Sequence, residues 1–122
     1  MGTFSVKMSL FPWQSRNGKK PVKVNALVDT GSFWSWAPAS ILHKLGVKPM
    51  ETVEGELANG TVVTKKVGQI EVEVQGKRRI TQIIFGDEGT EPLLGALTLE
   101  ELGFEVSPAG KQLKPIKIFP MK

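Results

Sequence analysis

The chain has 122 residues, a formal net charge of +4 and no cysteine. This length suits one domain over residues 1–122, with a modest core rather than two lobes. The lack of cysteine excludes disulfides, thiolate catalysis and cysteine-ligated metal sites. No apolar run approaches the ~20 residues that a membrane-spanning helix needs, and nothing resembles a secretion signal. We therefore expect a cytoplasmic protein without a membrane partner.

The basic residues are spread along the chain. Short groups lie at expected turns or on solvated strand faces: Lys19-Lys20, Lys65-Lys66 and Lys77-Arg78-Arg79. Solubility explains this distribution, and the alternative is a basic barrel that binds nucleic acid. Because no recognition helix or aromatic stacking strand accompanies the charges, we expect no nucleic-acid partner. A steep salt dependence of binding would support the alternative.

The first part of the chain has the patterns of two strands. Residues 4–10 alternate between apolar and smaller or polar side chains, which predicts a half-buried strand. Asn17-Gly18 predicts a turn with positive φ. Residues 22–28 alternate at first and become uniformly apolar before Asp29. This change indicates a strand that runs into the centre of a sheet.

A short helix and two hairpins are predicted next. Residues 38–45 have a helical pattern, with Pro38 at the first helical position and Gly46 as the stop. Asn59-Gly60 is the strongest hairpin signal in the chain, and Gln75-Gly76 marks a second turn. Strands are expected on both sides of each turn.

The remaining elements complete a mostly β fold. Residues 80–85 predict a strand, and residues 97–102 predict a helix that Gly103 closes. Residues 107–110 predict a turn. A last strand is expected to contain Leu113, Ile116 and Ile118. The fold class that follows is a mostly β domain with one or two short helices, arranged as a small closed barrel.

The two aspartates of the chain stand in different settings. Asp87 lies in the polar turn of residues 86–89, where solvent satisfies the carboxylate. Asp29 follows three apolar residues and precedes Thr30-Gly31-Ser32, so its carboxylate leaves a buried strand and needs hydrogen-bond partners. The hydroxyls of Thr30 and Ser32 can donate such bonds. Taken alone, the tripeptide fits equally well an Asp that caps its own backbone at a turn.

The wider pattern resembles the aspartic peptidase family. Members of that family have an apolar strand carrying Asp-Thr-Gly, a flap hairpin, and an apolar-apolar-Gly segment before a helix. Here Asp29-Thr30-Gly31-Ser32 is followed by Trp36 and Pro38, and later by Leu93-Leu94-Gly95. Asn59-Gly60 falls between the two motifs, where the flap tip belongs. The resemblance covers about residues 24–103 and is nearest to the single-lobe, retropepsin-like branch.

The resemblance implies an endopeptidase with an acid-protease-type barrel that works as a two-fold homodimer. In the family chemistry, two carboxylates share a proton and activate a water molecule against a peptide bond. Because one chain has one suitable Asp, the second would come from another copy. The implied catalytic residues are Asp29, Thr30 and Gly31. The residues implied to contact an extended peptide are Ser32, Phe33, Trp34, Ala58, Asn59, Gly60 and Leu93. No cofactor or metal is implied.

The resemblance also suggests individual roles. Thr30 would hydrogen-bond across the dimer, Gly31 would accept main-chain hydrogen bonds from substrate, and Ser32 would steady the carboxylate. Phe33 departs from the family pattern, because retroviral members usually have an acidic residue there. The chain also has no tyrosine to serve as the flap tyrosine of pepsin-like enzymes.

Several alternatives stay open at this point. Trp34 and Trp36 fit either the core or the wall of a substrate pocket, and Leu93 and Leu94 are equally ambiguous. The only histidine, His43, cannot build a multi-histidine metal site. A non-catalytic peptide-binding or dimerisation module on the same fold is the alternative function, because fold does not determine function.

Overall fold

A computed structural model describes residues 4–12, 20–107 and 109–121. The predicted turn at Asn17-Gly18 lies outside the described residues. In chain order the elements are β1 (Ser5–Phe11), β2 (Val22–Val28), β3 (Ser35–Pro38), α1 (Ala39–Lys44), β4 (Pro49–Glu56), β5 (Val62–Val74), β6 (Lys77–Gly86), β7 (Leu93–Leu94), α2 (Ala96–Leu102), β8 (Phe104–Val106) and β9 (Leu113–Pro115). The mostly β composition with two short helices is as predicted.

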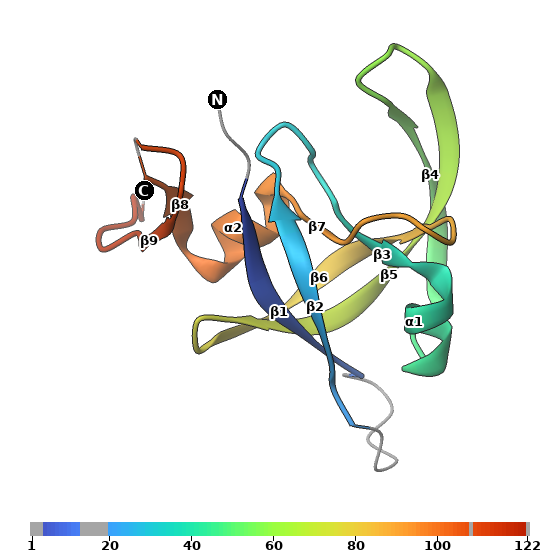
Figure 1. The fold of residues 1–122 in the computed structure, drawn as a ribbon, viewed down its shortest axis with the longest axis horizontal. Helices are drawn as coiled ribbons and strands as arrows, with labels where there is room; N and C mark the ends of the chain where they lie inside the picture. Colours follow the sequence, from blue (N-terminus) through green and yellow to red (C-terminus); the bar gives the residue numbers. More distant parts are fainter. Residues whose placement is uncertain (1–3, 13–19, 108, 122) are drawn as a thin grey trace.

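The large sheet closes on itself. Its strand order is β1-β2-β7-β3-β6-β5-β4, and β1 pairs antiparallel with both β2 and β5. Closure thus leaves β4 outside a six-stranded barrel, which confirms the predicted closed barrel (Figure 1). Fully buried side chains from several strands fill it, among them Met8, Leu10, Ile70, Ile83 and Leu94. Burying each such side chain stabilises the fold by about 1.5–3 kcal/mol.

Both predicted hairpins form. Gln75 and Gly76 have φ of 50° and 83°, so they make the two-residue turn between β5 and β6 whose twist suits the flanking strands. The β4–β5 turn is longer. Leu57 N–H donates to the Thr61 carbonyl at 2.8 Å, and Asn59 Oδ1 accepts from the Thr61 N–H at 2.9 Å. This hairpin extends away from the barrel (Figure 1).

The helix α2 ends at Leu102 as predicted, whereas α1 begins one residue later and ends one residue earlier than the predicted range of 38–45. Pro38 is the last residue of β3, where it pairs with Gly86 of β6, and its ψ is 137°. It is therefore the N-cap of α1 rather than the first helical residue. The Glu88 carboxylate caps α1, accepting the Ser40 hydroxyl at 2.7 Å and the Ser40 N–H at 3.1 Å. The bond from the Ser40 hydroxyl lowers the pKa of Glu88 most, and the bond from the Ser40 N–H lowers it further. No helix in the described parts of the chain is long and apolar enough to cross a membrane.

The C-terminal strand is shorter than predicted. β9 pairs with β8 in a separate two-stranded sheet, and this pairing ends at Phe104 opposite Pro115. Ile116 donates one more backbone bond, to Gly103 at 2.7 Å, but it lies outside the strand, and Ile118 is 86% exposed. The prediction of a strand through Ile118 is therefore wrong. Before Phe104 the partner chain is not extended, because Gly103 has a φ of 77° and closes α2, so Ile118 has no strand to pair with.

Candidate active site

Asp29 lies where β2 leaves the barrel. Leu27 and Val28 pair in parallel with β7, and the Asp29 N–H donates to the Leu94 carbonyl at 3.0 Å. The Asp29 side chain is only partly buried. Its Oδ1 accepts the Gly31 N–H at 3.0 Å, whereas Oδ2 has no hydrogen-bond partner among the residues that the structure describes. One oxygen is thus fixed by the loop itself, and the other is available.

Residues 29–34, which we call the Asp29 loop, are supported by the start of α2. The Ala96 N–H donates to the Ser32 carbonyl at 2.8 Å, and the Leu97 N–H donates to the Phe33 carbonyl at 3.0 Å. A Cβ on Gly95 would lie 2.4 Å from the Trp34 carbonyl oxygen, so only glycine permits this approach. The glycine of the apolar-apolar-Gly segment therefore sets the position of the Asp29 loop.

A buried series of hydroxyl groups connects Ser35, the first residue of β3 directly after this loop, to α2 and β6. Ser35 Oγ accepts the Gly95 N–H at 3.0 Å and lies 2.6 Å from Thr98 Oγ1, which lies 2.9 Å from Thr81 Oγ1. Thr81 donates to the Glu101 carboxylate at 2.6 Å. Because an ionised carboxylate only accepts, every hydroxyl proton points toward Glu101. This series of hydrogen bonds satisfies all three buried hydroxyls, because each one donates to the next group in the series.

The side chains after Gly31 are oriented by local contacts. The Ser32 hydroxyl donates to the Trp34 carbonyl at 2.8 Å. The expected bond from Ser32 to the Asp29 carboxylate is therefore replaced by a bond within the loop, to a carbonyl two residues along the chain. Trp34 Nε1 donates to Gln82 Oε1 at 2.9 Å, and the exposed Phe33 ring meets the Trp34 indole edge-on at 5.0 Å.

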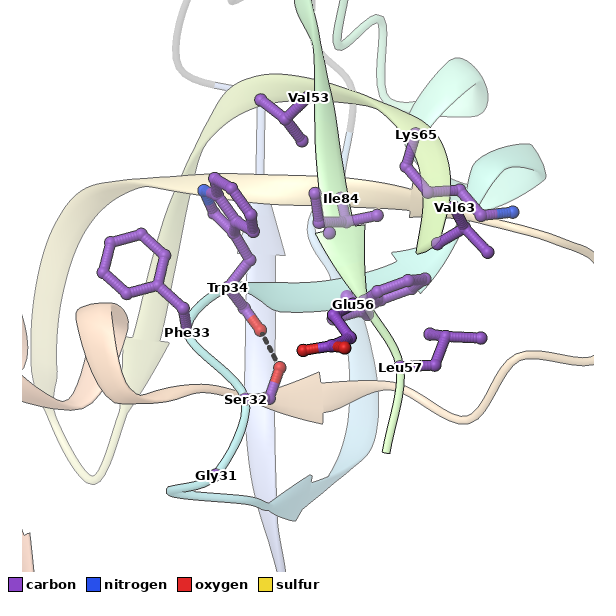
Figure 2. A pocket seen from close by; sticks show the side chains of 12 residues that line it. Gly31, Ser32, Phe33, Trp34, Val53, Glu56, Leu57, Val63, Lys65 and Ile84 are labelled. Atoms are coloured by element: carbon purple, nitrogen blue, oxygen red, sulfur yellow. Dashed lines mark hydrogen bonds between the residues drawn. The ribbon is translucent and has the colours of Figure 1, made fainter. Parts of the chain in front are cut away.

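A cavity of about 220 Å³ separates the Asp29 loop from the β4–β5 hairpin (Figure 2). The Asp29 loop contributes Gly31, Ser32, Phe33 and Trp34; the hairpin contributes Val53, Gly55, Glu56, Leu57, Val63 and Lys65; the barrel contributes Trp36 and Ile84. Trp34 and Trp36, whose sequence pattern fits either the core or a pocket wall, both line this cavity. Its size fits one side chain rather than a drug-sized ligand.

Other residues implied by the resemblance lie around the cavity rather than in its lining. Ala58, Asn59 and Gly60 form the exposed tip of the hairpin. Thr30 is exposed beside Asp29. Leu93 is half-buried on β7, where it pairs with Leu27 and Trp36, and its neighbour Leu94 is fully buried in the core.

The sequence reasoning missed the hairpin residues that line the cavity. Val53, Gly55 and Leu57 recur at every second position, which is the spacing of one strand face. That pattern was a usable signal for a face turned toward the site. Val63 and Lys65 have the same spacing on β5. Glu56 had no such signal, because it falls between Gly55 and Leu57 and its place in the lining depends on how the hairpin twists over the barrel.

Among the described residues, neither Asp87 nor His43 has a setting like that of Asp29. Asp87 is exposed, and its Oδ1 pairs with Lys65 Nζ at 3.0 Å. His43 packs its ring against Phe85, with the ring centroids 5.3 Å apart. In the described residues, no three His, Cys, Asp or Glu side chains gather in a way that could hold a metal ion.

Comparisons with known proteins identify the family and the fold of the chain. A family model described as "Aspartyl protease" matches residues 15–106. The fold is similar to the solution structure of the Simian Foamy Virus (mac) protease, with a TM-score of 0.55 and 17% identity over 79% of this chain and 91% of that chain. No curated protein matches the sequence. The family match spans most of the chain, including the Asp29 loop and the hairpin, so the chain belongs to the aspartyl protease family and has a retropepsin-like fold.

Proposed function

We propose that the protein is an aspartic endopeptidase whose active site forms between two copies of the chain, with Asp29 from each copy. The observation that carries this proposal is the setting of Asp29. Its backbone is tied to β7, its Oδ1 is held by Gly31, and its Oδ2 has no partner in the described chain. The other aspartate, Asp87, belongs to the turn of residues 86–89, is exposed there and pairs with Lys65.

The chemistry requires two carboxylates in close contact. At a separation of about 3 Å two carboxylates cannot both ionise, so they share one proton. The protonated carboxyl then polarises the substrate carbonyl, while the ionised one takes a proton from the attacking water. A single copy supplies one half of this pair, and a two-fold axis beside Asp29 supplies the other. The rate should follow a bell-shaped pH profile that belongs to the pair as a unit.

The neighbouring residues have supporting roles in the proposal. Thr30 is exposed, so its hydroxyl is available to a backbone group of the second copy. The Gly31 N–H is already used by Asp29, which leaves the Gly31 carbonyl to accept a main-chain N–H of the substrate. The hairpin tip at residues 58–60 would close over an extended peptide and exclude water.

The direct test is the Asp29→Asn variant, assayed on an unstructured peptide with apolar residues. Cleavage should be lost while the dimer persists in sedimentation analysis, because Asn keeps the shape but cannot act as a base. Asp87→Asn is the matched control and should retain cleavage. Cleavage that survives in Asp29→Asn overturns the proposal. Peptide binding without cleavage in the unmodified chain would instead favour a non-catalytic binding module.

A mixing experiment tests whether the site is shared. When the unmodified chain and Asp29→Asn are mixed in equal amounts and allowed to exchange, about one quarter of the dimers contain two aspartates. Activity per total protein should therefore fall to about one quarter of the unmixed value. A fall to only about one half would mean that each chain works alone.

A further inference from the structure

The cavity beside the Asp29 loop has largely apolar walls. The indoles of Trp34 and Trp36 line it together with Val53 and Ile84. The Trp34 N–H is already bonded to Gln82, so this indole presents only its hydrocarbon surface and its π face. The Ser32 hydroxyl is likewise committed to the Trp34 carbonyl. The walls therefore favour a side chain with an apolar stem.

Two charged side chains, Lys65 and Glu56, also line the cavity, and they differ in their partners. Lys65 Nζ forms an ion pair with Asp87 at 3.0 Å, and its side chain is 21% exposed. Glu56 forms no ion pair or side-chain hydrogen bond within the described residues. Figure 2 shows the Glu56 carboxylate directed toward Ser32, whereas the ammonium group of Lys65 extends to the other side, beside Val63. The charge left available to a ligand is negative.

We infer that this cavity selects a lysine or arginine side chain of the substrate, with Glu56 as the specificity-determining residue. The inference rests on the proposed peptidase function. A lysine or arginine stem would lie along the tryptophan and valine walls while its charged end pairs with the carboxylate. The indole faces add a cation–π attraction for the same charge. An acidic side chain would instead meet the Glu56 charge without compensation.

The experiment uses the full chain and one unstructured peptide series at about pH 6, where an ordinary carboxylate is ionised. Each member places lysine, norleucine or glutamate at one position around a single cleavable bond. Norleucine keeps an apolar stem and removes the charge. At one position the kcat/KM for lysine should exceed that for norleucine by about tenfold, and glutamate should be the poorest. The ratio of kcat/KM for lysine to that for norleucine should fall to about twofold or less in Glu56→Gln. In Glu56→Lys the glutamate peptide should have the highest kcat/KM of the three.

Glu54→Gln is the matched control, because Glu54 is an exposed glutamate on the same strand and does not line the cavity. It should keep the lysine preference. The inference is overturned if lysine and norleucine peptides are cleaved equally at every position, or if Glu56→Gln keeps the preference. If no peptide is cleaved, the proposed function fails, and fluorescence anisotropy of the same peptides decides the inference. Equal affinity for lysine and norleucine peptides would then refute it.

Discussion

The Asp29 loop and the β4–β5 hairpin face each other across one cavity, but they are held in different ways. The loop receives backbone hydrogen bonds from α2 and touches Gly95 so closely that no side chain fits between them. The hairpin, residues 49–66, is mostly exposed and is held by its own ladder and the Lys65–Asp87 ion pair. A surface ion pair contributes at most about 1 kcal/mol. The comparison shows that the Asp29 loop is fixed by tertiary contacts, whereas the hairpin above the cavity is held mainly by its own strand pairing.

The largest difference in stability should appear between two glycine-to-alanine variants, one against the Asp29 loop and one in the hairpin. In Gly95→Ala the new Cβ meets the Trp34 carbonyl at 2.4 Å, so the Asp29 loop must move, and the free energy of unfolding should fall by about 3 kcal/mol or more. In Gly55→Ala the new Cβ meets no atom within 4 Å, so the change should stay within about 1 kcal/mol. Urea unfolding measures both. Equal losses would contradict the contrast between the Asp29 loop and the hairpin.

A smaller effect should follow from interrupting the hydroxyl chain beneath the loop. Thr98→Val keeps the shape of the side chain but leaves Ser35 and Thr81 without their buried partner, which should cost about 1–3 kcal/mol. Thr64→Val on the exposed hairpin is the control and should change stability by less than about 0.5 kcal/mol. If Thr98→Val unfolds at the same urea concentration as the unmodified chain, the hydroxyl chain does not support the loop.

The smallest effect concerns the Trp34–Gln82 bond at the border between the Asp29 loop and the cavity. Gln82→Leu leaves the half-buried indole N–H unpaired, which should cost about 1 kcal/mol. A double-mutant cycle with Trp34→Phe should give a coupling energy of similar size, because both variants remove the same bond. The measurement is the free energy of unfolding of all four proteins. Strictly additive losses would show that the bond does not fix the indole.

The sequence predicted those features that depend on local chemistry. Gln75-Gly76 and Asn59-Gly60 mark turns because positive φ is needed there, and Gly46 and Gly103 end helices for the same reason. The apolar run before Asp29 predicted a strand leading into the barrel, and that strand is β2. The last strand was predicted too long, because Ile116 and Ile118 are residue types that suit a strand. The strand that pairs with it ends at Phe104, opposite Pro115.

The site was predicted less completely than the fold. Residues 31–34 line the cavity and follow Asp29 directly in the chain, so one linear motif was enough to predict them as neighbours. The opposite wall comes from the hairpin, whose path over the barrel depends on long-range pairing between β4, β5 and β6. The expected Ser32 contact failed because a nearby carbonyl, that of Trp34, accepts the hydroxyl instead. Residue type alone does not determine which of two neighbouring acceptors a hydroxyl chooses.

The distance between the two Asp29 carboxylates in an experimentally determined dimer tests the shared site most directly. The proposed mechanism predicts that the nearest oxygens of the two side chains lie within hydrogen-bond reach, at about 3 Å. A dimer in which the two carboxylates stay well apart, with and without a bound peptide mimic, would contradict the shared proton on which the proposed activity depends.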